Sequence, residues 1–387
     1  SKPELIIGNA SANDNQGQLI VISGTEIEAL QAKSSPYQRV VDLADAKYRD
    51  SAENADRIRY FKHPKAGASQ LGFSLLAGQF GGQGEGQDLA IGAPGFSVST
   101  GTSNKTAAVG AVLLLKRNSN FFTTNSASAL TVLSTGYDLK KLDPSLKLDH
   151  VISQTTEAKG GSVKAEANSL RFGESLTLFP SKTTGRPDDL VIGAPGLVEN
   201  IKLIKGRNDV FDTDVADGLA KMRTTAQPNS DPPDDEYVSV VSGAMLLLNG
   251  SSNYQLDHAL LLQANNYDGT DTEAGAALSS GDFDGDGVDD LVFGLPAYDN
   301  RAGAVAVLSG KTLQQANLQR GSNKGLFHAF AKASFFLPGG RASEQLGRYL
   351  SMRGSLNGDK TDDLIVGNPD ANACLLYTSP SPRDQRG

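Results

Sequence analysis

Short apolar runs that end at a glycine recur along the chain and predict short, buried strands. The recurring pattern is Asp-Leu, two apolar residues, Gly, one variable residue and Pro. It occurs as Asp88-Leu-Ala-Ile-Gly-Ala-Pro94, Asp189-Leu-Val-Ile-Gly-Ala-Pro195, Asp290-Leu-Val-Phe-Gly-Leu-Pro296 and Asp363-Leu-Ile-Val-Gly-Asn-Pro369, with Glu4-Leu-Ile-Ile-Gly-Asn-Ala10 as a degenerate fifth copy. Because the runs are apolar without alternation, we expect each strand to be covered on both faces. Proline lacks an N–H group, so the prolines are expected to end the strands.

Each complete copy has the same neighbours in the sequence. Upstream lies an apolar-glycine start: Leu71-Gly-Phe-Ser74, Phe172-Gly-Glu-Ser175, Ala274-Gly-Ala-Ala277 or Leu346-Gly-Arg-Tyr349. Downstream lies a glycine-led apolar strand: Gly17-Gln-Leu-Ile-Val-Ile22, Gly110-Ala-Val-Leu-Leu-Leu115, Gly243-Ala-Met-Leu-Leu-Leu248 or Gly303-Ala-Val-Ala-Val-Leu308. Each repeat therefore supplies several short strands.

These motifs resemble FG-GAP repeats, which occur in the propeller of integrin α-subunits and in the C-terminal part of GPI-specific phospholipase D. The resemblance covers most of residues 1–373 and implies an all-β fold, a β-propeller with one four-stranded blade per repeat. The repeats are expected near residues 1–24, 70–116, 171–249, 274–310 and 345–373. Family propellers usually have seven blades, so five repeats, with the first and last cut, are fewer than that number.

Three segments fall outside this pattern. Residues 196–240 include Gln227-Pro-Asn-Ser-Asp-Pro-Pro-Asp-Asp235 and are expected to form a long exposed loop, either functional or a disordered insertion. A short surface helix is expected between Glu26 and Ala55. Residues 374–387, which contain the single cysteine Cys374, are interpreted as a translated sequencing adapter, with a genuine Ser/Pro-rich tail as the alternative.

The segment Asp282-Phe-Asp284-Gly-Asp286-Gly-Val288-Asp-Asp290 carries carboxylates at alternate positions, with two glycines between them. A tight loop can aim such side chains at one point, and a ligand set made only of oxygen favours Ca²⁺. An EF-hand would need Glu at the twelfth position, which is Phe293 here. The resemblance implies side-chain ligation by Asp282, Asp284, Asp286 and Asp290 and carbonyl ligation by Val288, with Asp289 facing solvent. A solvated acidic turn without metal is the alternative.

The other repeats keep the turn with fewer acidic residues. The loop of the last repeat offers Ser355, Asn357, Asp359, Thr361 and Asp363, a weaker candidate for calcium. The loops at residues 79–88 and 180–189 have lost the alternating carboxylates, so we expect them to hold their turns without metal.

Composition and motifs also bear on nucleic-acid binding, membrane insertion, catalysis and glycosylation. The net charge of −8 and the isoelectric point near 5.1 argue against a nucleic-acid-binding surface. No apolar run reaches the roughly 20 residues of a membrane span. Four scattered histidines and a Gly310-Lys-Thr312 that lacks the rest of a phosphate-binding loop form no catalytic constellation, which leaves an enzymatic role undecided. N-glycosylation sequons begin at Asn9, Asn104 and Asn249.

Two functions fit this sequence, and a purely structural repeat domain is a third interpretation. The first is a calcium-stabilised, extracellular propeller whose loop face binds a protein or a glycan in adhesion, as the resemblance to integrin α-subunits implies. The second is the non-catalytic part of a secreted GPI-specific phospholipase D, whose catalytic domain would precede Ser1. The absence of cysteine before Cys374 departs from the disulfide-bearing integrin propeller and slightly favours either the second function or a microbial relative.

Overall fold

The computed structural model describes a little over half of the chain. The described residues are 4–33, 58–62, 68–81, 87–99, 106–108, 110–115, 130–135, 171–182, 185–203, 237–250, 254, 260–266, 272–319, 325–330, 332–369 and 375–377.

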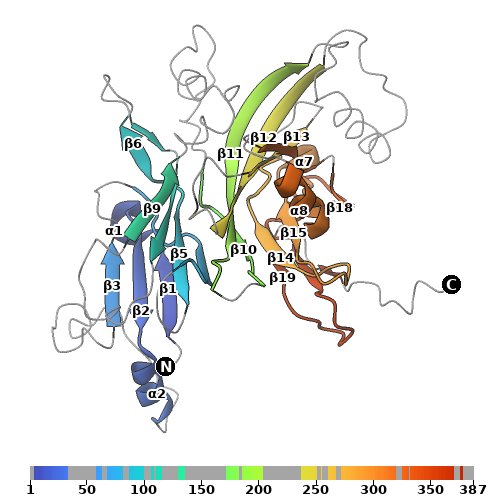
Figure 1. Ribbon diagram of the computed structural model, residues 1–387. Helices are drawn as coiled ribbons and strands as arrows, with labels where there is room; N and C mark the ends of the chain where they lie inside the picture. The colour runs from blue at the N-terminus through green and yellow to red at the C-terminus, as the bar shows by residue number, and fades with distance from the viewer. Residues whose placement is uncertain are drawn as a thin grey trace.

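Strands dominate these residues and form five sheets of three or more strands, which follow the order of the chain except for β17 (Figure 1). The first sheet contains β1 (Leu5–Asn9), β2 (Gln18–Ile22) and β3 (Ile58–Lys62). The second contains β4 (Leu75–Gly78), β5 (Asp88–Ala93), β8 (Ala111–Leu115) and β9 (Leu130–Thr135). The third contains β10 (Leu176–Phe179), β11 (Asp189–Leu203), β12 (Tyr237–Leu248), β13 (Leu260–Asn266) and β17 (Gly325–His328). The fourth contains β14 (Leu278–Gly281), β15 (Asp290–Gly294), β16 (Ala304–Leu308) and β18 (Phe335–Pro338). The fifth contains β19 (Tyr349–Met352), β20 (Leu364–Gly367) and β21 (Leu375–Tyr377).

Neighbouring strands are antiparallel in all of these sheets except at the parallel pair β13–β17. A small hairpin of β6 (Ser97–Ser99) and β7 (Thr106–Ala108) completes the described strands. The all-β class predicted from the sequence is therefore confirmed.

The helices are short and lie between strands. They are α1 (Ala12–Asn15), α2 (Gly24–Gln31), α7 (Tyr298–Arg301) and α8 (Gly310–Gln319). Helix α2 meets part of the expectation for Glu26 to Ala55, but it begins two residues earlier because the Ser23 hydroxyl accepts the Glu26 N–H at 3.2 Å and caps it. Residues 34–57 lie outside the described residues.

The apolar strands are buried on both faces, as their lack of alternation predicts. In β15, Leu291 and Phe293 pack in the core between the third and fourth sheets, and Val292 packs in the core between the fourth and fifth. All three side chains are fully buried. Successive residues of a strand point to opposite faces, so each central strand contributes to two cores.

Consecutive sheets meet through glycine backbones. The Gly347 N–H bonds to the Gly367 carbonyl within the fifth sheet, and its own carbonyl faces Gly294 of the fourth sheet. A Cβ atom on Gly294 would overlap the Gly347 carbonyl oxygen and lie 2.9 Å from its carbon. The same contact joins Gly8 to Gly72, Gly92 to Gly173, and Gly193 to Gly275. The glycines of the repeated motif thus permit one recurring approach between sheets.

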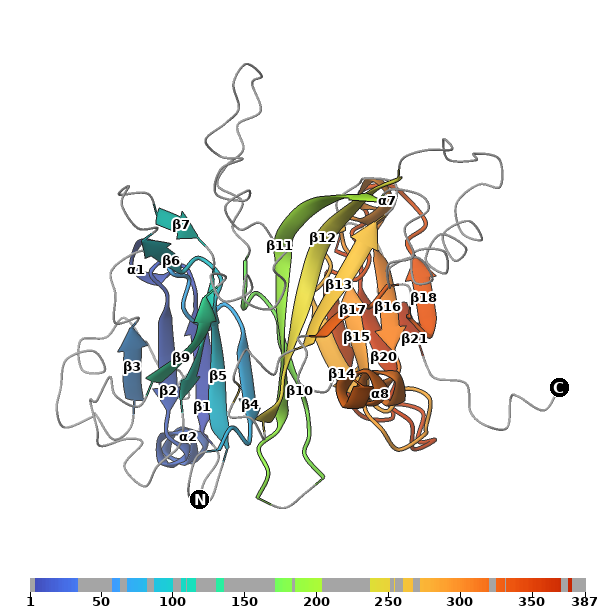
Figure 2. The same ribbon diagram turned by 45° about the horizontal axis from the view of Figure 1, so that its top comes forward.

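The sheets follow one another across the molecule, with the N-terminal sheet at one side (Figure 2). Their first strands are in contact in the order β4, β10, β14 and β19. The hairpin loops that follow these strands therefore lie next to one another at one edge of the sheets.

Two expectations need correction in the third sheet. The long loop expected over residues 196–240 is strand at both ends, because β11 continues to Leu203 and pairs with β12 from Tyr237 onward. Pro195 does not end β11: the register shifts between Ala194 and Val198, and such an irregularity accommodates a residue without an N–H. Residues 204–236 lie outside the described residues.

The segment interpreted as an adapter enters the fifth sheet, where Leu375–Tyr377 pairs with β20 as β21. Backbone pairing at an open strand edge depends little on side-chain identity, so this strand does not test the interpretation.

We expect Gly294→Ala to lower the free energy of unfolding by about 3 kcal/mol or more, because the added Cβ meets rigid backbone. Gly340→Ala is the control, because a Cβ there meets no atom within 4 Å and the change should stay within about 0.5 kcal/mol. Denaturant unfolding of both variants makes the comparison. Equal stabilities would contradict the role given to the glycine contact.

Candidate metal centre

The loop between β14 and β15 is a tight hairpin loop built around two glycines. Gly281 pairs with Asp290, which closes the hairpin. Gly285 and Gly287 have φ angles of 73° and 82°, in the left-handed region that favours glycine. These turns allow the chain to curl so that alternate side chains share one side of the loop.

Three carboxylates each use one oxygen to hold the loop backbone. Asp282 Oδ2 accepts the Gly287 N–H at 2.9 Å, and Asp284 Oδ1 accepts the Asp286 N–H at 3.1 Å. Asp286 Oδ1 accepts the Val288 N–H at 2.9 Å. These three hydrogen bonds shape the loop without a bound ligand.

Asp282, Asp284 and Asp290 converge. Each offers a carboxylate oxygen, and these oxygens lie within 4.8 Å of one another. Asp282 Oδ1 is buried and has no hydrogen-bond partner. A buried oxygen without a donor is costly, and a cation among the three carboxylates would remove that cost.

Asp290 is the most deeply buried member, with 1% of its surface exposed. Its Oδ2 accepts the Phe283 N–H at 3.0 Å, and its Oδ1 accepts the Gly310 N–H at 2.9 Å, at the first residue of α8. Burial raises its pKa to about 6, against the pull of these hydrogen bonds. Asp284 is exposed, but desolvation of its carboxylate by the surrounding loop, together with the charges of Asp286 and Asp282, raises its pKa.

Asp286 is not one of the three grouped carboxylates, and ligation by the Val288 carbonyl stays a prediction. Asp286 Oδ2 pairs with Lys311 Nζ at 3.0 Å, and this hydrogen bond is the main cause of a lowered pKa for Asp286. Val288 lies in the same loop, where its N–H is held by Asp286. Of the four side chains predicted as ligands, three are grouped in the structure and the fourth has an ion-pair partner.

The residues present fit a hard divalent cation. The grouped atoms are all carboxylate oxygens, and Ca²⁺ takes six to eight oxygen ligands. Asp282, Asp284 and Asp290 would hold such an ion.

The loop of the last repeat is closed by its own donors. Asp359 Oδ1 accepts the Thr361 hydroxyl at 2.6 Å and the Thr361 N–H at 3.0 Å, and Asp359 Oδ2 accepts the Asn357 amide at 2.9 Å. The Ser355 hydroxyl also reaches Asp359 at 3.2 Å. Asp363 Oδ2 accepts the Leu356 and Asn357 N–H groups at 2.6 and 3.2 Å. The Ser355, Asn357 and Thr361 side chains supply hydrogens, whereas the corresponding Asp282, Asp284 and Val288 of the β14–β15 loop supply none at neutral pH. Calcium binding in the loop of the last repeat stays a prediction.

The two earlier loops are also held by hydrogen bonds where they are described. Asp88 Oδ2 accepts the Phe80 N–H at 2.9 Å, and Asp188 Oδ1 accepts the Ser181 N–H at 2.8 Å. Residues 82–86 and 183–184 of these loops lie outside the described residues.

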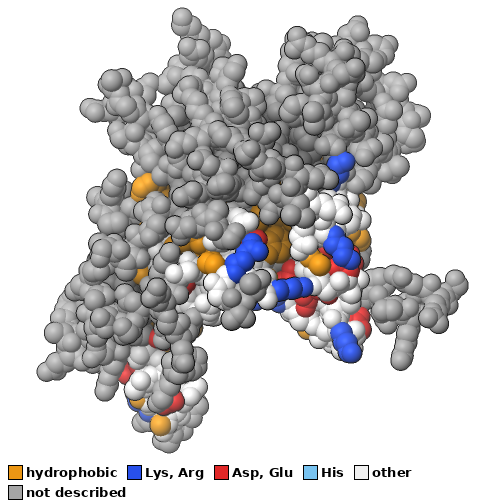
Figure 3. All heavy atoms as spheres, viewed as in Figure 1, with side chains coloured by type: hydrophobic (Ala, Val, Ile, Leu, Met, Phe, Trp, Pro, Cys, Tyr) orange, Lys and Arg blue, Asp and Glu red, His pale blue; other side chains and the backbone are white. Residues whose placement is uncertain are grey.

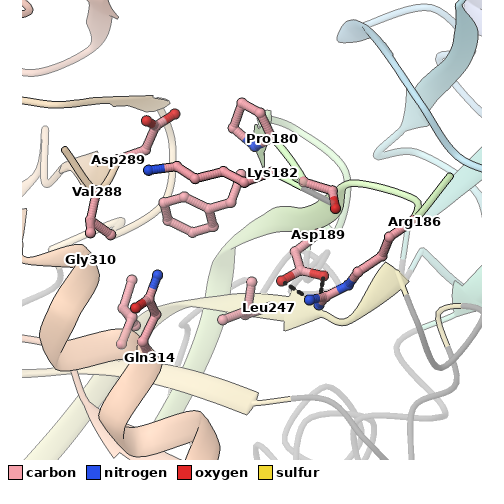
Figure 4. Close-up of a pocket in the computed structure, with 12 residues that line it drawn as sticks. Pro180, Lys182, Arg186, Asp189, Leu247, Val288, Asp289, Gly310 and Gln314 are labelled. Carbon is pink, nitrogen blue, oxygen red and sulfur yellow. Dashed lines mark hydrogen bonds and ion pairs between the residues drawn. The ribbon is translucent and has the colours of Figure 1, made fainter. Parts of the chain in front are cut away.

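A pocket of about 220 Å³ lies beside the Asp282–Asp290 loop, between the β10–β11 loop and α8 (Figure 4). Lys182 reaches across it and donates to the Gly287 carbonyl, while Arg186 pairs with Asp189 at 3.2 Å. Asp289 was expected to face solvent, but it lines this pocket and is half-buried, and burial raises its pKa. Basic and acidic side chains lie side by side on the face shown in Figure 3.

Sequence reasoning missed Gly310 and Lys311 as partners of the acidic loop. A signal for Gly310 exists, because a polar residue followed by glycine after the glycine-led strand recurs at Ser23-Gly24, Asn249-Gly250 and Ser309-Gly310. Gly250 donates to Asp189 at 2.9 Å, as Gly310 does to Asp290. No sequence pattern indicates the ion pair between Asp286 and Lys311, which lie far apart in the chain.

The sequons differ in their surroundings. Asn9 is exposed at the end of β1, and the Asn249 side chain is half-buried and accepts a hydrogen bond from Arg186 at 3.3 Å. Asn104 lies outside the described residues. Within the part of the chain that the structure describes, no helix is long and apolar enough to cross a membrane.

The geometry defines a repeat protein made of antiparallel sheets, with an acidic loop between the first two strands of the fourth sheet. A family model of the FG-GAP repeat matches residues 274–308, which span this loop and strands β14 to β16. The chain therefore carries an FG-GAP repeat, and the match supports assigning the sheets as propeller blades. No closure of the sheets into a ring is seen among the described residues. No curated protein matches the chain.

We expect Thr361→Val to raise the pKa of Asp359, because the Thr361 hydroxyl is the main cause of its lowered pKa. A lowered carboxyl pKa stabilises the fold above the ordinary pKa, and this contribution is lost as the pH falls below that value. Carboxyl NMR titration in chelator measures the shift. Thr361→Ser keeps the hydroxyl and should leave the pKa unchanged, so equal values in the two variants would refute the assignment.

Proposed function

We propose that this chain is a calcium-binding, extracellular FG-GAP module that binds a protein or glycan partner in adhesion. The observation that supports calcium most directly is the cluster of Asp282, Asp284 and Asp290 around the buried, unpartnered Asp282 Oδ1. FG-GAP repeats are typical of extracellular proteins, which supports the location.

The proposed role of calcium is to offset the free-energy cost of placing charged carboxylates close together in the loop. Burial raises the pKa of Asp290 to about 6, so the charged carboxylate is disfavoured there. A bound divalent ion would supply the positive charge that offsets this cost and the repulsion from Asp284. Asp290 is held by two backbone N–H groups and keeps its orientation without the ion. The site thus braces a hairpin rather than performs chemistry.

The partner surface is proposed to be the loop face of the sheets. Loops carried on a rigid β-scaffold are common binding sites. Mixed positive and negative side chains occur together on the face in Figure 3, which suits a polar protein or glycan partner better than nucleic acid.

A second candidate is the non-catalytic part of a GPI-specific phospholipase D. The feature that favours it is the lack of any cysteine before Cys374. The complete coding sequence separates the two: histidine-rich zinc ligands upstream would favour the phospholipase, and a membrane-spanning segment downstream would favour the adhesion protein.

Calcium is expected to raise the melting temperature of the chain relative to chelator. At a calcium concentration 100 times Kd, the stabilisation is about 2.7 kcal/mol. Asp284→Asn should reduce this effect by weakening the site. Asp299→Asn, a matched change of an exposed aspartate outside the loop, should keep it. Identical melts of the folded wild-type chain in calcium and in chelator would refute the site.

Lys311→Gln is expected to strengthen calcium binding, because it releases Asp286 Oδ2 and removes a positive charge beside the loop. Lys311 is exposed and Asp286 is half-buried, so the ion pair is partly screened by solvent and the gain should stay below about tenfold in Kd. Calorimetric titration measures it, with Arg341→Gln, an exposed arginine after β18, as the control. Weaker binding by Lys311→Gln would contradict the expected competition.

A further inference from the structure

Asp362 lies in the β19–β20 loop of the fifth sheet and binds the backbone of Asp282, one of the candidate calcium ligands. The Asp282 N–H donates to Asp362 Oδ2 at 2.8 Å, and the Asp362 N–H donates to the Asp282 carbonyl at 2.9 Å. Both polar backbone groups of Asp282 are thus bound by one residue that lies 80 positions later in the chain. The other carboxylate oxygen, Asp362 Oδ1, accepts the Gly354 N–H at 2.7 Å, which fixes Asp362 within its own loop.

The two loops are fitted to each other around this contact. A Cβ atom on Gly281 would lie 2.6 Å from Asp362 Oδ2 and 2.7 Å from the Met352 carbonyl oxygen. A Cβ atom on Gly285 would lie 2.8 Å from Thr361 Cγ2. Glycines on both sides of Asp282 therefore make room for the neighbouring loop, and that loop sets where Asp282 lies.

The same pair of hydrogen bonds joins the second and third sheets, where no acidic cluster exists among the described residues. Asp188 Oδ2 accepts the Gln79 N–H at 2.8 Å, and the Asp188 N–H donates to the Gln79 carbonyl at 2.7 Å. Asp188 Oδ1 is fixed by the Ser181 N–H at 2.8 Å. Asp188 and Asp362 occupy the same place, directly before the aspartate that opens the repeated motif.

The junction between the third and fourth sheets cannot form this contact. Asp289 occupies the corresponding place in the fourth sheet, and the residue that follows β10 is Pro180, which has no N–H to donate. Pro180 and Asp289 instead line the pocket beside α8. The contact therefore depends on a particular pair of residues and is not a general result of sheet packing.

We propose that Asp362 is a positioning residue for calcium at the Asp282–Asp290 loop, an inference that rests on the proposed function. It acts through the backbone of Asp282 and leaves the carboxylate of Asp282 available to the ion. Calcium binding in the fourth sheet consequently depends on the folding of the loop in the fifth.

The test compares calcium affinity in Asp362→Ala, Asp362→Asn and Asp188→Ala by calorimetric titration of the full chain. Loss of residues that orient metal ligands typically weakens affinity 10- to 100-fold, and Asp362→Ala should show at least about tenfold. Asp362→Asn retains only one of the two acceptor oxygens, so it should bind calcium measurably more weakly than the wild-type chain but more tightly than Asp362→Ala. Asp188→Ala removes the equivalent contact at another junction, so it should lower the melting temperature without changing the calcium Kd.

A second readout needs no metal. Hydrogen exchange of the Asp282 amide in chelator should be faster in Asp362→Ala than in the wild-type chain, and unchanged in Asp188→Ala. Equal loss of affinity in Asp362→Ala and Asp362→Asn would mean that only the charge matters and would overturn the positioning role, as would wild-type affinity in both. If Asp362→Ala does not fold, wild-type affinity in Asp362→Asn overturns it. If the wild-type chain binds no calcium, the proposed function fails first.

Discussion

The close backbone contact between glycines of consecutive sheets is the constraint on which the rest of the structure depends. Gly294 lies against the Gly347 carbonyl with no room for a Cβ, and the same approach recurs at three other junctions. Because the first strands of successive sheets are held at one spacing, the hairpin loops that follow them meet at one edge. A side chain at these glycines would move a whole sheet, and with it the loop that the sheet carries.

A contact between neighbouring loops makes the position of Asp282 depend on the next sheet. Asp282 belongs to the fourth sheet by sequence, yet its backbone is bound by Asp362 of the fifth. The acidic loop is therefore only partly a local structure. Its carboxylates converge because Gly285 and Gly287 turn the chain, and Asp282 is held in place from outside the repeat.

The sequence was sufficient for features that depend on neighbours along the chain. The apolar run Leu291-Val-Phe293 predicted a strand covered on both faces, and alternate aspartates predicted a convergent loop. The sequence was insufficient for features that depend on contacts between segments far apart in the chain. The extension of β11 past Pro195 depends on pairing with β12, and the ion pair of Asp286 with Lys311 depends on where α8 begins. The burial of Asp289 likewise depends on the β10–β11 loop that faces it.

The hairpin loops differ in how many hydrogen-bond donors their carboxylate oxygens meet. All of the described loops use carboxylate oxygens to hold backbone N–H groups. In the last repeat, Ser355, Asn357 and Thr361 add hydrogens of their own, so the oxygens of Asp359 are matched by donors. In the loop of the fourth sheet, Asp282 and Asp284 replace Ser355 and Asn357, and Val288 replaces Thr361. Aspartate brings oxygens and no hydrogens at neutral pH, and valine has no hydroxyl to donate. The buried Asp282 Oδ1 has no hydrogen-bond donor, and this unmatched oxygen is the feature of the loop that favours the proposed cation.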